Sequence, residues 1–221
     1  MSRLVSKPEG RGEEWSLDDV QYLHLEGVSW ELNEHLLKVV GDRALRLTYD
    51  SGELEIMSPL AEDETAKKII GRLIETLTEE WDIPLGALGS TTFRRKRRRK
   101  GLEPDECFYI VNLRAIAGKK RLSLPKDPPP DLAVEVDVTS RSIPRLPIYA
   151  ALEVPEVWRF DGQTLHCLHL GRDGEYHRKS NSRVFPDLKP HELLPFIEIA
   201  IRTSDQNAAV KAFRKWIRAS R

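Results

Sequence analysis

The sequence has few cysteines and no excess of charge of either sign. Only Cys107 and Cys167 occur among 221 residues, which excludes a secreted disulfide scaffold and favours a reducing compartment. The 35 Lys and Arg residues balance the 35 Asp and Glu residues, which excludes a uniformly basic, histone-like protein. No apolar run reaches the roughly 18 residues of a membrane span, and no apolar segment follows the first residues. We therefore expect a soluble, cytoplasmic protein.

Several catalytic and metal-binding motifs are also absent. The sequence contains no C-x-x-C pair and no H-E-x-x-H or H-x-x-E-H motif, so it predicts no structural zinc site. It contains no G-x-S-x-G elbow, phosphate-binding loop or G-x-G-x-x-G motif, which leaves serine hydrolases, NTPases and dinucleotide enzymes without support. The cysteines are interpreted as buried apolar side chains. The histidines, including His24, His35, His166 and His169, are interpreted as structural.

What the chain does have is enough apolar sequence to build one core. The hydrophobic fraction is 40%, and helical and strand-like patterns alternate along the chain. We predict one domain over residues 16–200, preceded by an arm at 1–15 and followed by a helix within 201–221. Long gaps between strands, filled by helices, favour a mixed α/β sheet over a sandwich. The predicted helices are 16–26, 30–40, 62–81, 143–152, 191–199 and 206–219, and the predicted strands are 44–49, 53–58, 85–93, 105–111, 131–138, 157–160, 164–170 and 175–179.

Carboxylates in the most apolar predicted strand are the first candidates for chemistry. Glu135 lies inside the run DLAVEVDV, and Asp137 follows two residues later on the same face of the strand. Asp105, 30 residues before Glu135, begins another predicted strand. A carboxylate in a buried strand is costly unless it is paired or bound to a cation. An ion pair with Arg145 or Arg159 is the alternative to a metal site.

A third carboxylate, Glu64, opens the longest predicted helix. If that helix packs on the same sheet, Glu64 converges with Asp105 and Glu135 on one hard cation. Mg²⁺ suits such a set because it binds through few protein carboxylates and keeps several waters. The alternative is that Glu64 only complements the positive end of the helix dipole.

A run of basic residues is the second candidate feature. In a neutral protein it concentrates positive charge in one place, and each contact with a phosphate would make binding sensitive to salt. A basic surface beside acidic residues suits a site that cleaves phosphodiester bonds. A solvated hairpin loop or a targeting tract is the alternative. The run consists of Arg94, Arg95, Lys96, Arg97, Arg98, Arg99 and Lys100.

Several sequence blocks together resemble the Uma-two family of the PD-(D/E)XK, or restriction-endonuclease-like, superfamily. The blocks are LRLTYDSGELEIMSPLAEDE, GSTTF, KGLEPDECFYI, PPDLAVEVDVTSRS and PIYAALEVPEVWRFDG, and the resemblance covers about residues 16–200. It implies an α/β (α+β) fold in which helices flank a mixed central sheet, to which the strand and turn patterns add an N-terminal hairpin and a C-terminal β-meander. It also implies an endonuclease that uses Mg²⁺, with Mn²⁺ as a substitute, to cleave DNA.

The resemblance assigns roles to the acidic candidates by position. Asp105 matches the aspartate of the PD motif, Glu135 the glutamate of the E-x-K motif, and Glu64 the acidic residue of the N-terminal core helix. These three would hold the metal ion. Double-stranded DNA would be the substrate, and a homodimer is expected because two copies related by a two-fold axis can cut both strands.

Two positions depart from the pattern of the family. Asp137 stands where the E-x-K motif has lysine, so it is either a further metal ligand or the partner of an arginine. Arg145 stands where related sequences place a lysine on the following helix, and Lys67 and Lys68 are possible substitutes. Asp63 stands where the family pattern has histidine.

These departures keep two other interpretations open. One is a degenerate nuclease that binds nucleic acid without cutting it. The other is a protein-interaction module whose basic run docks an acidic partner.

Overall fold

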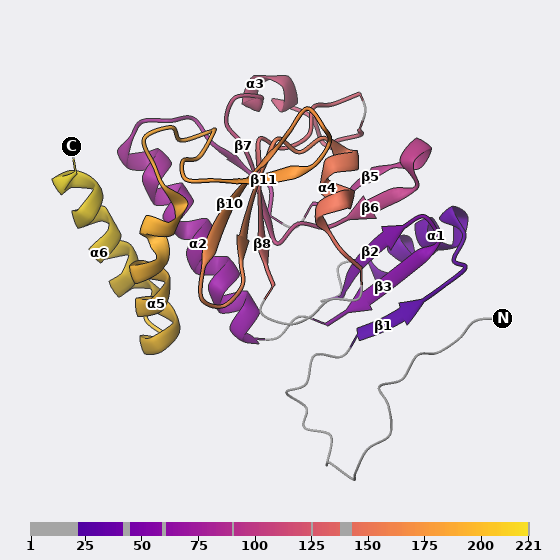
Figure 1. Ribbon diagram of the computed structural model, residues 1–221, viewed down its shortest axis with the longest axis horizontal. Helices are drawn as coiled ribbons and strands as arrows, with labels where there is room; N and C mark the ends of the chain where they lie inside the picture. The colour runs from indigo at the N-terminus through magenta and orange to yellow at the C-terminus, as the bar shows by residue number, and fades with distance from the viewer. Residues whose placement is uncertain are drawn as a thin grey trace, which may run out of the picture.

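The computed structural model describes residues 22–41, 45–58, 61–89, 91–124, 126–137 and 143–220. The predicted arm at 1–15 lies outside these residues. The described chain forms two β-sheets flanked by helices, the α+β architecture of restriction endonucleases (Figure 1). No helix in the described segments combines the length and apolarity needed to cross a membrane.

The smaller sheet joins two hairpins that are far apart in the sequence. Its strand order is β1-β3-β2-β6-β5, and all its pairings are antiparallel. The predicted hairpin at 44–58 is confirmed as β2 and β3, and the basic run forms most of the second hairpin. The elements are β1 (Tyr22–Leu25), α1 (Trp30–Val40), β2 (Arg46–Asp50), β3 (Glu53–Met57), β5 (Phe93–Arg95), η1 (Lys96–Arg98) and β6 (Lys100–Leu102).

The larger sheet has the order β11-β10-β9-β8-β7-β4. Strands β8 and β9 are parallel, with α4 in the connection between them, and the other pairs are antiparallel. The predicted C-terminal meander is confirmed as β9, β10 and β11. The elements are β4 (Gly86–Ala87), β7 (Glu106–Tyr109), α3 (Leu113–Ile116), β8 (Leu132–Val136), α4 (Leu146–Leu152), β9 (Glu156–Phe160), β10 (Leu165–Leu170) and β11 (Tyr176–Lys179).

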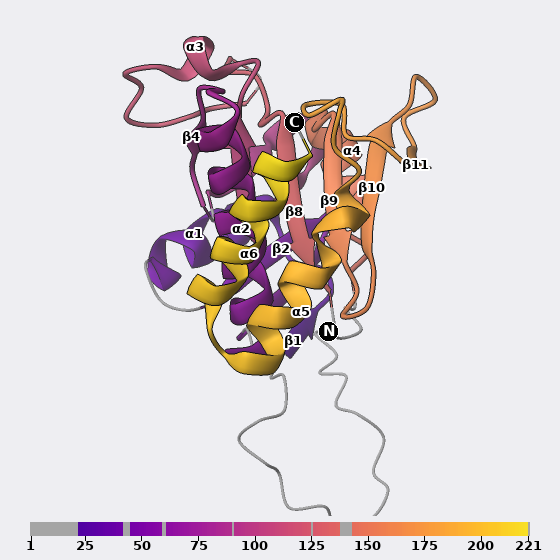
Figure 2. The ribbon, with the colours of Figure 1, turned by 90° about the vertical axis from the view of Figure 1, so that its left-hand side faces the viewer.

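Three helices cover one face of the larger sheet. Helix α2 (Ala61–Glu80) buries an apolar stripe that includes Ile70, Leu73 and Leu77, as the three- and four-residue spacing predicts. The chain ends in η2 (Pro190–Leu193), α5 (Leu194–Thr203) and α6 (Gln206–Ala219). Figure 2 shows α5 and α6 lying beside α2, and their apolar side chains join the same core. The opposite face of the sheet packs on α4.

Two predicted elements differ from the structure. Residues 22–25, predicted as the end of a helix at 16–26, form strand β1, which pairs with β3 from Tyr22 opposite Met57 to Leu25 opposite Leu54. The open edge of β3 offers hydrogen bonds that override a weak local helix signal. The predicted strand at 85–93 is two strands in different sheets, because the chain turns at Gly89, whose φ is +54°.

Candidate active site

Asp105 and Glu135 are brought together by the pairing of β7 with β8. Glu106 lies opposite Val134 in this antiparallel ladder, so Asp105 continues it opposite Glu135. The Asp105 carboxylate accepts a hydrogen bond of 2.6 Å from the backbone N–H of Val136. Asp105 is 2% exposed and Glu135 is 3% exposed, so neither carboxylate can rely on water to stabilise its charge.

An arginine from the smaller sheet links Asp105 to the long helix. Arg46, at the start of β2, forms an ion pair with Asp105 and places its Nη2 atom 2.6 Å from the Oε1 atom of Glu64. Glu64 lies in the first turn of α2, as predicted. One guanidinium group therefore lies between two of the three predicted metal ligands.

A second arginine and a tyrosine lie against Glu135. The Nη1 atom of Arg145 is 3.2 Å from Glu135 Oε2, and the Tyr149 hydroxyl donates to Glu135 Oε1. Arg145 also donates to the carbonyl of Glu103. Burial disfavours the guanidinium charge, but Glu135 and, to a lesser extent, Tyr149, Glu55 and Asp137 together outweigh it and raise the pKa of Arg145 above its ordinary value. Arg145 is thus a permanent cation within this cluster.

The two lysines of α2 differ in position. Lys67 is 7% exposed, and its Nζ atom lies 3.2 Å from Glu64 Oε2. Lys68 is exposed and lies 3.6 Å from Glu106. Only Lys67 of this pair belongs to the acidic cluster.

Asp137 faces an arginine on the neighbouring strand. Its Oδ2 atom is 2.6 Å from Arg159 Nη2 and 3.1 Å from Arg159 Nε. Arg159 is the residue opposite Glu135 in the parallel β8–β9 ladder. The structure therefore pairs Asp137 with Arg159 and Glu135 with Arg145, the ion pairs that the sequence offered as an alternative.

Three residues near this cluster were not predicted from the sequence: Arg46, Glu55 and Tyr149. Glu55, on β3, is 2% exposed, and its Oε2 atom accepts a hydrogen bond of 3.4 Å from the backbone N–H of Ile143. In the sequence, Arg46 and Glu55 stand at alternating positions of a hairpin and look solvent-facing. Met57 is the only apolar residue on their face of the hairpin, so no local signal in the sequence marks them as buried.

The predicted ligands do not form the tightest group of metal-binding side chains. Within the described segments, one group of three or more His, Cys, Asp and Glu side chains places its ligand atoms within 4.8 Å of one another. That group is Glu156, Cys167 and His169. The sequence predicted no such cluster because the motifs considered were local, whereas this group combines two strands.

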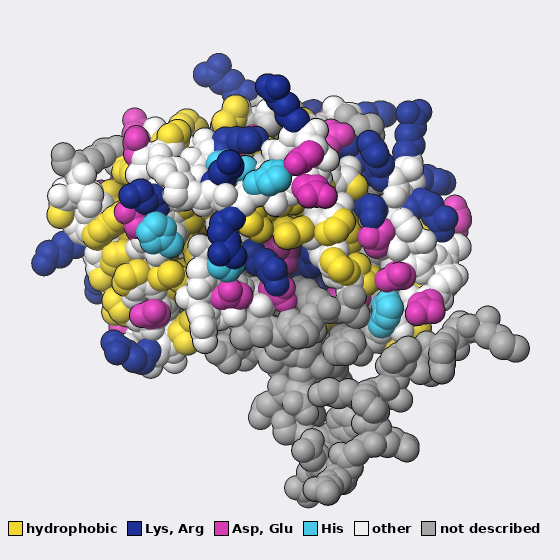
Figure 3. All heavy atoms as spheres, in the orientation of Figure 1, with side chains coloured by type: hydrophobic (Ala, Val, Ile, Leu, Met, Phe, Trp, Pro, Cys, Tyr) yellow, Lys and Arg dark blue, Asp and Glu magenta, His cyan; other side chains and the backbone are white. Residues whose placement is uncertain are grey.

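The basic run forms an exposed hairpin, whose charge is partly balanced by acidic neighbours. Figure 3 shows dark blue Lys and Arg side chains gathered where Figure 1 places β5 and β6. The tip, with Arg97 and Arg98, is exposed. Four members of the run are paired: Arg94 with Glu34 at 3.1 Å, Arg95 with Glu153 at 2.6 Å, Lys96 with Glu31 at 3.8 Å and Lys100 with Asp50 at 2.5 Å.

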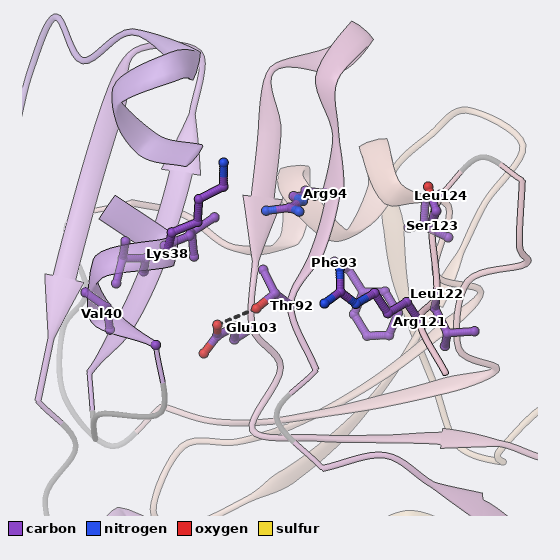
Figure 4. A pocket seen from close by; sticks show the side chains of 13 residues that line it. Lys38, Val40, Thr92, Phe93, Arg94, Glu103, Arg121, Leu122, Ser123 and Leu124 are labelled. Atoms are coloured by element: carbon purple, nitrogen blue, oxygen red, sulfur yellow. Dashed lines mark hydrogen bonds between the residues drawn. The ribbon is translucent and has the colours of Figure 1, made fainter. Parts of the chain in front are cut away.

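A cavity of about 400 Å³ lies beside the basic hairpin, between α1, β5 and residues 121–124 (Figure 4). Lys38, Arg94 and Arg121 supply three cations to its wall. On the inner side lies Glu103, which accepts a hydrogen bond of 2.5 Å from Thr92 and whose carbonyl contacts Arg145. The cavity therefore offers positive charge beside Glu103, two residues before Asp105 in the chain.

The fold is of the restriction-endonuclease-like α+β class. A family model described as "Putative restriction endonuclease" matches residues 30–202, which is most of the chain. The protein belongs to this family, Uma2, as the sequence blocks predicted. No curated protein matches the chain.

Proposed function

We propose that this protein is a metal-dependent endonuclease that hydrolyses phosphodiester bonds in DNA. The observation that carries the proposal is the meeting of Asp105 and Glu135 across the β7–β8 ladder, with Glu64 joined to them through Arg46. Membership of a family of restriction endonucleases supports a nuclease and the use of a divalent metal. DNA as the substrate and Mg²⁺ as the ion are parts of the proposal.

The donor set fits a hard divalent ion. Asp105, Glu135 and Glu64 offer carboxylate oxygens, and Mg²⁺ needs only a few of these because it keeps part of its water shell. Mn²⁺ accepts the same ligands. When bound, the ion would supply a water of lowered pKa and would withdraw charge from the scissile phosphate.

The cations of the cluster have roles that follow from their chemistry. Arg46 and Arg145 would bind the non-bridging oxygens of the phosphate, because a guanidinium group matches that geometry with two parallel hydrogen bonds. Lys67 takes the place of the missing E-x-K lysine, since its Nζ atom already contacts Glu64. Asp137 keeps Arg159 in position through their ion pair.

DNA would approach from the side of the basic hairpin. The exposed tip residues would contact backbone phosphates, and the cations of the neighbouring cavity would continue this positive surface toward Asp105. The ion pairs of Arg95 with Glu153 and of Lys100 with Asp50 join the hairpin to the rest of the protein, which leaves the charge of the tip for the nucleic acid.

A second candidate function is a nuclease fold that binds nucleic acid without cutting it. The observation that favours it is the direct pairing of the carboxylates with Arg46 and Arg145, which already balance their charge. Asp137, which stands at the lysine position of the E-x-K motif, also favours a protein that does not cleave DNA. Such a protein would bind DNA without metal and yield no product.

The test is nicking of supercoiled plasmid DNA with Mg²⁺, with Mn²⁺ and with EDTA. We expect metal-dependent nicking that Glu135→Gln and Asp105→Asn each reduce by about 10²-fold or more, because each change removes one charged ligand. Asp187→Asn, at an exposed position, serves as the matched control and should cut like the unchanged protein.

The outcomes separate the two functions. DNA retarded in a gel but never nicked would establish the second candidate. Equal nicking by the unchanged protein and by Glu135→Gln would remove this site from the reaction.

A further inference from the structure

Glu156, Cys167 and His169 gather on the face of the larger sheet opposite Glu135. Glu156 lies on β9, and Cys167 and His169 lie on the adjacent antiparallel strand β10, with His169 opposite Glu156. Cys167 belongs to the core that α2 covers, whereas Glu135 points toward Tyr149 on α4. The group is therefore separate from the acidic cluster.

The separations within the group match those between metal ligands. Cys167 Sγ is 3.5 Å from His169 Nε2 and 3.4 Å from Glu156 Oε1, and His169 Nε2 is 3.8 Å from Glu156 Oε2. Bond lengths of about 2.3 Å to sulfur and about 2.0 Å to nitrogen or oxygen give a tetrahedral zinc site edges of roughly 3.3–3.6 Å. Cys167 Sγ is thus already spaced from His169 Nε2 and from Glu156 Oε1 like two edges of such a site, and one ligand atom from each of the three side chains lies within 4.8 Å of the others.

The surroundings hold these side chains in place as the neighbours of metal ligands do. Glu156 is fully buried, and its Oε2 atom accepts the backbone N–H groups of Arg183 and Val184 at 2.7 and 3.1 Å. Its Oε1 atom accepts from Trp158 Nε1 at 2.6 Å and from the Cys167 thiol at 3.4 Å, and a metal ion would take the place of the thiol proton in the second contact. Hydrogen bonds of this kind orient a ligating carboxylate.

The remaining position of the site opens toward solvent. The His169 side chain is 15% exposed, whereas Glu156 is wholly covered, so an ion would enter past the imidazole. A water molecule would complete four-coordination there.

We propose that Glu156, Cys167 and His169 bind one transition-metal ion of the Zn²⁺ type. The mixed sulfur, nitrogen and oxygen donors select a borderline ion such as Zn²⁺ rather than Mg²⁺. On binding, the thiol of Cys167 loses its proton to solvent, and the resulting thiolate bonds to the metal. The ion would join β9, β10 and the segment at Arg183 that Glu156 already anchors.

The test is titration of the chelator-treated, reduced protein with Co²⁺, a spectroscopic substitute for Zn²⁺. We expect one equivalent to produce a thiolate-to-cobalt charge-transfer band together with the intense visible bands of tetrahedral Co²⁺. Zn²⁺ should displace the signal and raise the melting temperature. Cys167→Ser should abolish the charge-transfer band, and His169→Asn should weaken the binding of Co²⁺ at least tenfold.

Cys107→Ser is the matched control, because Cys107 is also a buried free thiol but hydrogen-bonds the carbonyl of Gly89 at 3.3 Å. This variant should keep the whole Co²⁺ signal. If Cys167→Ser fails to fold, His169→Asn at its partly exposed position still decides the question. Absence of the band in the unchanged protein, or its survival in both site variants, overturns the proposal. Plasmid nicking tests the acidic cluster separately.

Discussion

At the scale of single residues, the main feature of this protein is the arginine placed between buried carboxylates. Arg46 pairs with Asp105, which is buried, and with Glu64, whose side chain is 37% exposed. A bound divalent ion would supply the same positive charge. Arginine and metal are therefore expected to compete for Asp105, and the free energy of unfolding should report that competition.

We predict that Arg46→Met lowers the free energy of unfolding by about 3–5 kcal/mol in EDTA, because it leaves buried charge unpaired. Mg²⁺ should restore more stability to this variant than to the unchanged protein. Urea unfolding with EDTA and with Mg²⁺ measures both effects. Arg172→Met, at an exposed position, is the control and should change neither value by more than about 0.5 kcal/mol. A Mg²⁺ effect equal in all three proteins would contradict the prediction.

Asp161 gives a second prediction at this scale, which concerns pH. Burial works against its charge, but the N–H groups of Thr164 and Gln163, at 2.7 and 3.0 Å, and the His166 ring outweigh it. The pKa of Asp161 is therefore below its ordinary 3.8. A carboxyl whose pKa is lowered by folding stabilises the protein above the unfolded-state pKa and loses that effect as pH falls through the folded-state value.

We accordingly expect Asp161→Asn to lower the free energy of unfolding at pH 7 by about 0.5–1 kcal/mol, a small value because the side chain is partly exposed. The difference between the two proteins should shrink as the pH falls below about 3.8. Urea unfolding across this range measures it, with Asp187→Asn as an exposed control. A difference that stays constant down to low pH would show that the charge of Asp161 is not the cause.

At the scale of elements, the β5–β6 hairpin decides how a neutral protein would hold a polyanion. Four of its cations are paired with acids of α1, β2 and the end of α4, which fixes the strands of the hairpin on the body of the protein. The exposed residues at the tip are the ones positioned to contact phosphates. We therefore expect the paired members of the run to attach the hairpin and the residues of the tip to contact phosphates.

We predict that Arg97→Gln combined with Arg98→Gln weakens DNA binding. The plot of log K against the logarithm of the salt concentration should become less steep by about 0.9 for each phosphate that the variant no longer neutralises. Fluorescence anisotropy at several salt concentrations measures both. Lys211→Gln with Lys215→Gln removes the same charge from exposed positions on α6, on the far side of the molecule in Figure 1, and should have little effect. Negligible DNA affinity in every variant would favour the protein-interaction module instead.

At the scale of the whole molecule, two sheets cooperate to build one candidate site. The larger sheet supplies Glu135 and Asp105, the smaller sheet supplies Arg46, and α2 supplies Glu64 between them. Neither sheet alone, nor α2 alone, supplies all the charged side chains of the candidate site. The ion pair between Arg46 and Asp105 therefore also ties the two sheets together.

We expect two copies of the molecule to act together, since cutting both strands of DNA is simplest with two sites related by a two-fold axis. Light scattering behind a size-exclusion column should give a mass of twice 25.4 kDa. The measurement should be repeated with a short duplex, because DNA can bring two copies together. A protein mass of 25.4 kDa both without DNA and within the complex with the duplex would assign the cutting of each strand to a single copy.

The sequence by itself determined the helices and strands that are specified by patterns of neighbouring residues. The apolar spacing of α2, the side-chain cap of α1 at Ser29 and the cap of α6 at Asp205 fix these helices near the predicted residues. The acids Asp105 and Glu135 were recognisable because a carboxylate in an apolar strand needs a partner wherever the strand lies. The same reasoning offered an ion pair with Arg145 or Arg159 as the alternative to a metal site at Glu135 and Asp137.

Only the tertiary structure decided which groups meet across long stretches of sequence. The first strand forms because β3 offers it an edge, and Arg46 reaches Asp105 because two sheets lie side by side. The group of Glu156, Cys167 and His169 depends on the register of β9 with β10, which no local spacing reveals. Local sequence sets backbone preference and burial, whereas the partners of a buried charge or thiol are set by strand register and by packing between layers.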